Sequence, residues 1–221
     1  MEIILYSHGF GVDKTDRGLF SGVATHLPRY RHVMFDYNMR NERGQMVVAA
    51  LDKQAGMLKE VYEKTKSENP DANIDLICHS QGCVVAALAK LPVGNTLFLA
   101  PPLSVADPNN KLKLRTYVFG RTGTKTLADG STEWPRSDGS TTIISRAYWD
   151  SYDALSDVND SYGVLAGVTD LTMFVVTDDE ILGHSDCSEL PSGIKVILME
   201  TGHNFANVRR EVAEKIEEIL K

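Results

Sequence analysis

Short apolar runs alternate with longer amphipathic segments along most of the chain. Apolar runs of about 4–8 residues are typical of buried strands, and apolar residues repeating at helical spacing are typical of helices. The runs predict strands at residues 3–6, 32–35, 74–78, 96–100, 171–176 and 194–199. The segments between them predict helices at 17–27, 46–64, 81–90 and 205–220. This alternation predicts an α/β fold with a mostly parallel sheet, and right-handed crossovers would place helices on both of its faces.

Residues 103–169 break this rhythm. Asp129-Gly130 and Asp138-Gly139 are strong turn pairs between Thr-rich and aromatic runs, so we expect one or two β-hairpins and then a helical stretch near 149–155. We therefore expect a single domain over 1–221 in which 103–169 is an insertion that caps the sheet as a lid. Both ends of the insertion are expected to emerge at the carboxyl edge. The alternative is a surface excursion with no role in substrate binding.

Residues 78–82, Cys-His-Ser-Gln-Gly, lie between an apolar strand and a helix of small residues. A sharp strand-to-helix turn of this kind raises a serine hydroxyl above the sheet, where it can act as a nucleophile. Small residues two positions before and after the serine avoid clashes in the turn, and Cys78 and Gly82 meet that need. Ser80 is therefore the predicted nucleophile. The alternative is a serine that only caps the helix.

Residues 7–11, Ser-His-Gly-Phe-Gly, follow the first predicted strand. Acyl transfer needs N–H donors directed at the developing oxyanion. One donor should be the backbone N–H of Gln81, directly after the nucleophile, and we assign the other to the backbone N–H of Phe10. His8 is expected to support this loop by hydrogen bonding. An ordinary glycine-rich strand exit is the alternative.

An acid and a histidine follow later in the chain. Asp178, Asp179 and Glu180 come directly after the strand at 171–176, and we favour Asp179 over Asp178 as the orienting carboxylate because apolar residues follow it. His203 lies between the last strand and the last helix, where it can reach over the sheet edge to Ser80. A solvated acidic loop and a surface histidine are the alternatives. His26, His32, His79 and His184 are expected to be structural.

The order serine, acid, histidine along the chain is that of α/β-hydrolases, and the four motifs together resemble that superfamily. The resemblance covers residues 2–100 and 170–221 and is strongest to small esterases and acyl hydrolases. It implies Ser80, Asp179 and His203 as a catalytic triad, with Phe10 and Gln81 at the oxyanion hole. Two departures from the pattern are Cys78 in place of the first glycine of G-x-S-x-G, and residues 36–40, which lack the usual D-x-x-G-x-G-x-S run.

Composition narrows the remaining function classes. The formal net charge of −7 argues against a nucleic-acid-binding protein, and no apolar run reaches the roughly 18 residues of a membrane span. The three cysteines form no disulfide pattern and the first residues do not look like a signal peptide, so we expect a cytoplasmic protein. No histidine or cysteine has metal-site spacing with the acidic run, so neither metal nor cofactor is expected.

We therefore expect a serine hydrolase that cleaves carboxylic esters of small molecules through an acyl-enzyme. Thioester or amide hydrolysis on the same triad is an alternative, and so is a binding module of the same fold without catalysis. The aromatic residues of the insertion are expected to form an apolar wall for the acyl group, above all Trp134 and Trp149, together with Tyr148 and Tyr152. The sequence leaves the oligomeric state open.

Overall fold

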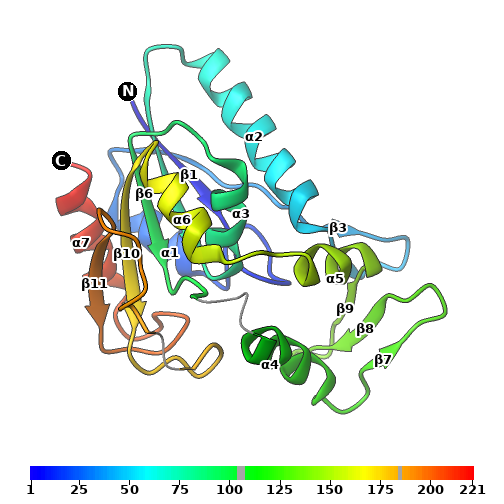
Figure 1. Ribbon diagram of the computed structural model, residues 1–221. Helices are drawn as coiled ribbons and strands as arrows, with labels where there is room; N and C mark the ends of the chain where they lie inside the picture. The colour runs from blue at the N-terminus through cyan, green and yellow to red at the C-terminus, as the bar shows by residue number, and fades with distance from the viewer. Residues whose placement is uncertain (104–107, 184–185) are drawn as a thin grey trace.

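A computed structural model describes residues 1–103, 108–183 and 186–221 of the chain. Its centre is a six-stranded sheet in the order β11-β10-β6-β5-β1-β2, and every neighbouring pair in it is parallel (Figure 1). The strands are β1 (Glu2–Ser7), β2 (Arg31–Val33), β5 (Asn73–His79), β6 (Asn95–Leu99), β10 (Asp170–Val176) and β11 (Lys195–Met199). The predicted parallel α/β sheet is confirmed.

Helices cover both faces of this sheet. α1 (Leu19–His26) and α7 (Arg209–Ile219) pack together on one face, and their apolar side chains form a core with those of β1, β6 and β10. α2 (Leu51–Glu68), α3 (Gln81–Ala89) and α6 (Val158–Ala166) cover the other face, with α3 between the other two. Strands buried on both faces read as continuous apolar runs, which is why the sequence identified them.

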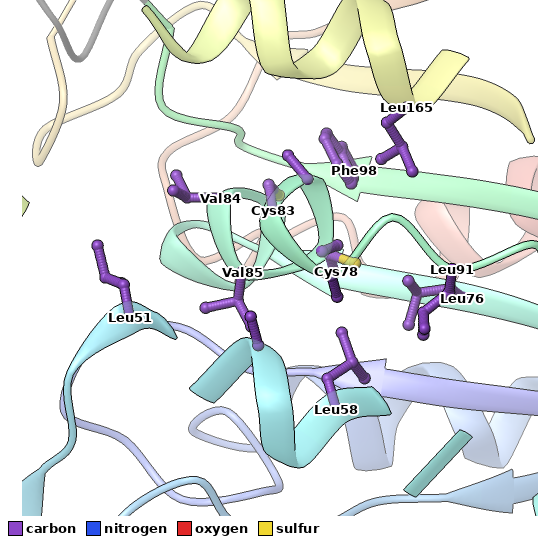
Figure 2. Close-up of a cluster of buried hydrophobic side chains, with 14 of the residues drawn as sticks. Leu51, Leu58, Leu76, Cys78, Cys83, Val84, Val85, Leu91, Phe98 and Leu165 are labelled. Atoms are coloured by element: carbon purple, nitrogen blue, oxygen red, sulfur yellow. The ribbon is translucent and has the colours of Figure 1, made fainter. Parts of the chain in front are cut away.

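The core on the α3 side holds both cysteines of the Ser80 region. Figure 2 shows Cys78 from β5 and Cys83 from α3 among aliphatic side chains of neighbouring elements. Both thiols are fully buried, and burial raises the pKa of each well above its usual value. Leu51 and Val84 lie at one end of this cluster (Figure 2) and also line the cavity beside Ser80.

A second, five-stranded sheet has the order β3-β4-β9-β8-β7 and lies to one side of the central sheet (Figure 1). β7 (Lys125–Thr126), β8 (Thr132–Pro135) and β9 (Thr141–Ile144) form two hairpins at Gly130 and Gly139, as predicted. Both glycines have positive φ values, 81° and 82°, which their turns require. α4 (Pro108–Phe119) and α5 (Arg146–Asp153) flank this sheet, and only the region of α5 was predicted.

The predicted helix at 46–64 is wrong at its start. Met46–Val48 forms strand β4, which pairs with β3 (Met39–Arg40) and with β9, and the helix begins only at Leu51. The partner strand β9 is distant in sequence, so local periodicity could not reveal this pairing. The last helix also begins later than predicted, at Arg209 rather than residue 205, because Phe205 takes a left-handed conformation with φ 52°.

The expectation that both ends of the insertion emerge at the carboxyl edge is wrong. β10 runs parallel to β6, with Asp170 opposite Asn95, so Leu171 starts at the amino edge. α6 packs against α3 and returns the chain across the sheet to that edge. We refer to the hairpins together with helices α4 and α5 as the cap, whereas α6 is a crossover helix of the central sheet. Within the described ranges no helix combines the length and apolarity that a membrane crossing requires.

The first turn of α3 lies directly against the end of β1. A Cβ atom on Gly82 would lie 2.0 Å from the carbonyl oxygen of Ser7. The Ser7 hydroxyl donates to the carbonyl oxygen of Gly82 over 2.8 Å and accepts from the Tyr37 hydroxyl over 2.7 Å. Residue 82 therefore has to be glycine for the strand and helix to meet in this way.

Gly82→Ala is expected to destabilise the fold by about 3 kcal/mol or more, because the added methyl overlaps backbone atoms that cannot move independently. Gly56→Ala is the matched control: Gly56 lies inside α2 with open space around it, so alanine should stabilise the helix by about 0.5–1 kcal/mol. Urea unfolding of both variants measures the difference. Equal stability of the two variants would contradict the steric account.

Candidate active site

A cavity of about 390 Å³ lies beyond the carboxyl ends of β1, β5 and β10, where ligands bind in parallel α/β sheets. Ser80, Gln81 and His203 line it together with Phe10, and helices α4 and α5 of the cap contribute the opposite wall. The fold thus brings three distant parts of the sequence and the cap to one place.

Ser80 occupies the turn between β5 and α3 with φ 51° and ψ −123°, a conformation that is rare for residues other than glycine. Its N–H donates to the carbonyl oxygen of Leu99 over 2.9 Å, which ties the strained turn to β6. Strain of this kind persists only where the surrounding structure enforces it, and it is concentrated at functional sites. The turn presents the Ser80 hydroxyl to the cavity at the N-terminal end of α3.

His203 connects Ser80 to a carboxylate. His203 Nε2 lies 2.9 Å from Ser80 Oγ, and His203 Nδ1 lies 2.8 Å from Asp179 Oδ2. The other oxygen, Asp179 Oδ1, accepts the backbone N–H groups of Ile181 and Leu182. Burial alone would raise the pKa of Asp179, but the His203 hydrogen bond, the His203 charge and these two N–H groups lower it overall. Asp179 thus remains an acceptor that holds the Nδ1–H tautomer of His203.

The neighbouring acids have different environments. Asp178 is exposed, whereas Glu180 Oε2 accepts the backbone N–H of His203 over 2.9 Å. A Cβ on Gly202 would lie 2.7 Å from the same Glu180 oxygen, so this loop fits closely around the carboxylate. Sequence reasoning did not assign Glu180 a role, because the bond depends on the juxtaposition of two loops.

The loop after β1 lies beside the Ser80 turn, as predicted. A Cβ on Gly9 would lie 3.4 Å from Ser80 Cβ. Within the described part of the chain, the backbone N–H groups of Phe10 and Gln81 have no acceptor, so both remain available to a bound oxyanion. His8 supports the loop: His8 Nε2 accepts the Tyr37 N–H, and His8 Nδ1 donates to the Gly9 carbonyl oxygen. Burial lowers the pKa of His8, which fits this neutral tautomer.

A second buried histidine–carboxylate pair lies beside the first. His79 Nδ1 donates to Asp16 Oδ2 over 2.8 Å, and His79 Nε2 donates to the carbonyl oxygen of His203 over 3.0 Å. Asp16 Oδ2 also accepts the Gly9 N–H over 2.7 Å. Because both ring nitrogens donate, His79 is an imidazolium. Burial would lower the pKa of His79, but the charge and hydrogen bond of Asp16 outweigh burial and raise it.

This pair joins the three loops of the site. His79 precedes Ser80, Asp16 holds the loop that carries Phe10, and the His203 carbonyl belongs to the loop of the candidate base. The expectation that His79 is structural named no partner for it, and no local pattern points to Asp16, because the two residues lie 63 positions apart. Among the described residues, neither His26 nor His32 contacts a residue of the site, and the His32 ring bonds to Tyr6 and Leu27 instead. His184 lies outside the described residues.

The Gln81 side chain ties the Ser80 turn to the cap. Its amide nitrogen donates to Gln54 Oε1 over 2.9 Å, and its amide oxygen accepts the Tyr148 hydroxyl over 2.6 Å. Gln54 in turn donates to the carbonyl oxygen of Ala49. All three side chains are buried. This chain of hydrogen bonds holds α2, α3 and α5 in register next to the Gln81 N–H.

Of the two tryptophans that were expected to form the apolar wall, Trp134 lines the cavity and Trp149 does not. Trp134 lines the cavity and packs against Phe10, with 5.7 Å between ring centroids. Trp149 does not line the cavity, which corrects its expected role. Its indole N–H donates to Thr132 Oγ1, and Arg115 stacks on its ring, so Trp149 joins α5 to α4 and the second sheet. Tyr148 and Tyr152 of the same helix line the cavity instead.

The described residues include no group of three or more histidine, cysteine, aspartate or glutamate side chains arranged to hold a metal ion. The site itself presents a hydroxyl, an imidazole, a carboxylate and two free backbone donors. Such a set can remove a proton from an alcohol, stabilise an oxyanion and return the proton to a leaving group.

No protein-family model matches the sequence, and no curated protein matches it in a sequence comparison. Solved structures are similar over nearly the whole chain. Est1E from Butyrivibrio proteoclasticus with ferulic acid bound has a TM-score of 0.70 at 16% identity, covering 100% of this chain and 88% of that one. An esterase from Pyrococcus furiosus has a TM-score of 0.66 at 13% identity, covering 99% and 80% of the two chains.

A third similar structure is a putative hydrolase of the alpha/beta superfamily from Xanthomonas campestris pv. campestris. It has a TM-score of 0.53 at 14% identity and covers 99% of this chain and 97% of that one. At these identities the agreement concerns the arrangement of the backbone. Together with the parallel sheet and the Ser80 turn, it shows that this chain has the α/β-hydrolase fold.

Proposed function

We propose that this protein is a serine hydrolase that cleaves carboxylic esters through an acyl-enzyme on Ser80. The observation that carries the proposal is the continuous series of contacts from Ser80 through His203 to Asp179. The free N–H groups of Phe10 and Gln81 beside it support the proposal. So do the esterases among the similar structures, one of which holds ferulic acid.

The proposed reaction has two halves. His203 Nε2 takes the Ser80 proton as the Ser80 oxygen attacks the ester carbonyl, and the Phe10 and Gln81 N–H groups stabilise the oxyanion. His203 then gives the proton to the departing alcohol, which leaves an acyl group on Ser80. Water attacks this ester with His203 again as base, the acid is released and Ser80 regains its proton. Asp179 stays ionised and stabilises the imidazolium in each half.

The cavity suggests which part of the ester lies where. The alcohol must depart next to His203, where Ile181, Leu182 and Asn204 line the cavity. The acyl group extends the other way, toward side chains from α2, α3 and the cap, which are mainly apolar: Leu51, Val84, Trp134, Tyr148, Tyr152 and Leu155. We therefore propose a neutral, apolar acyl group.

The thiols support a cytoplasmic location for this hydrolase. Cys78, Cys83 and Cys187 are all free, and Cys187 is partly exposed. Secreted proteins more often hold such residues in disulfides.

Ser80→Ala is expected to lower kcat for p-nitrophenyl butyrate by about 10⁶-fold while the protein stays folded. A fluorophosphonate probe should label the wild type and not this variant, because only an activated serine reacts with it. Cys78→Ala is the control for the buried thiol and should keep the labelling. Activity of Ser80→Ala within tenfold of the wild type would refute the proposed function.

Asp179→Asn is expected to lower kcat/KM by about 10⁴-fold, because an amide no longer fixes the required tautomer of His203. Asp178→Asn is the matched control and should change kcat/KM by less than about threefold, since the exposed Asp178 side chain does not contact His203. Steady-state kinetics on the same ester decides between the two acids. A larger loss in Asp178→Asn than in Asp179→Asn would show that Asp178, and not Asp179, orients His203.

Tyr152→Ala is expected to shift the preference toward longer acyl chains, because it enlarges the apolar part of the cavity. The ratio of kcat/KM for p-nitrophenyl octanoate to that for the butyrate should rise about tenfold. Trp149→Phe is the control: it loses the Thr132 hydrogen bond and should lower the melting temperature without changing the ratio. An unchanged ratio in Tyr152→Ala would show that the acyl group lies elsewhere.

A further inference from the structure

A second cavity, of about 460 Å³, adjoins the first on the other side of the loop after β1. Three segments form its walls: that loop, the β3–β4 hairpin and the β8–β9 hairpin. Val12 and Arg17 of the loop line both cavities, so the second cavity borders the candidate active site directly. The proposed function makes no use of it.

Four arginines line this cavity: Arg17, Arg40, Arg43 and Arg136. Within the described residues, none of the four has a carboxylate within 4.0 Å. Five arginines elsewhere, at positions 29, 31, 115, 146 and 210, each pair with an acid. Arg121 and Arg209 also have no acid partner among the described residues, so four of six such arginines line one cavity of a chain whose net charge is −7.

Two acids also line the cavity, Asp13 and Asp138, so the balance of charge there is positive. Each has one carboxylate oxygen occupied by a nearby backbone N–H and hydroxyl: Asp13 by those of Thr15, and Asp138 by those of Ser140. These local turns engage one oxygen of each acid, and four cations face two anions among the side chains that line the cavity.

Arg136 shows most clearly that an acceptor is missing. Its Nη1 atom is buried without a hydrogen-bond partner among the described residues, which is unfavourable for any polar group and more so for a charged one. Its guanidinium lies 4.2 Å above the Trp134 ring and against Gly11, so it is held in place. Burial is the main cause that lowers the pKa of Arg136, and the Arg17 charge lowers it further, while the Tyr117 and Asp138 charges offset part of the shift.

The geometry points to an anion-binding site that takes a carboxylate or a phosphate group between Arg136, Arg40 and Arg43. Guanidinium groups bind these anions through two parallel hydrogen bonds, and Arg136, Arg40 and Arg43 all line this one cavity. The anion has two sources: the leaving group of an ester in the first cavity, reached past Arg17, or a separate small molecule. The first source rests on the proposed function and the second does not.

The first arm of the test measures binding of inorganic phosphate to the wild-type protein by calorimetry at low ionic strength. Arg136→Gln and the double variant Arg40→Gln/Arg43→Gln are each expected to weaken binding by tenfold or more. Arg31→Gln is the control, because it removes one surface charge at the amino edge of β2, the edge of the central sheet opposite the site, and it should change binding by less than twofold. If Arg136→Gln fails to fold, the double variant still tests the site, because Arg40 and Arg43 are exposed and their replacement should leave the fold intact.

The second arm compares the butyryl ester of 4-hydroxybenzoate with the butyryl ester of its neutral methyl ester. If the anion is part of the substrate, the wild type prefers the carboxylate, and the double variant loses that preference by tenfold or more. Phosphate binding without an ester preference assigns the site to a separate anion. No phosphate binding together with no ester preference would overturn the proposal. Because calorimetry needs no turnover, it also tests the anion site in a protein that fails to hydrolyse esters.

Discussion

The contact between the first turn of α3 and the end of β1 is the constraint on which the site depends. Gly82 leaves no room for a side chain against the Ser7 carbonyl, and this closeness forces Ser80 into the left-handed region of φ. The same closeness brings the loop after β1 next to the Ser80 turn. A single backbone approach thereby sets the positions of the hydroxyl, of the Gln81 N–H and of the Phe10 N–H.

Two histidine–carboxylate pairs surround that contact and do different work. In the pair that borders the cavity, His203 can take up and release a proton because its Nε2 atom faces the Ser80 hydroxyl. In the inner pair, both ring nitrogens of His79 donate hydrogen bonds. The charged His79 ring therefore joins Asp16 to the His203 loop and has no nitrogen left to accept a proton. Buried polar groups that are all satisfied specify one arrangement of the loops, since each alternative would leave a charge unpaired.

The cap completes the site with two opposite environments. On the side of α5, tyrosines and aliphatic residues make an apolar wall, and the hydrogen bond from Tyr148 to Gln81 ties that wall to the Ser80 turn. On the side of the hairpins, Trp134 separates the apolar cavity from the arginine cluster, since it faces the first and carries Arg136 on its ring. An ester with an apolar acyl group, and with a carboxylate or phosphate on its alcohol part, would match both environments.

The sequence by itself determined the parallel sheet and the order of its candidate site residues. Strands buried on both faces are continuous apolar runs, and the turn after β5 requires a small residue at 82, so both leave a local signal. The register that favoured Asp179 over Asp178 was also local, because a chain leaving an acid with apolar residues buries that acid. The tertiary structure decided what depends on distant partners. Met46–Val48 became a strand because β9 lies beside it, and Trp149 turned away from the cavity because Thr132 and Arg115 hold it. His79, Asp16, Glu180 and the four arginines acquired their places only when loops far apart in the chain met at one edge of the sheet.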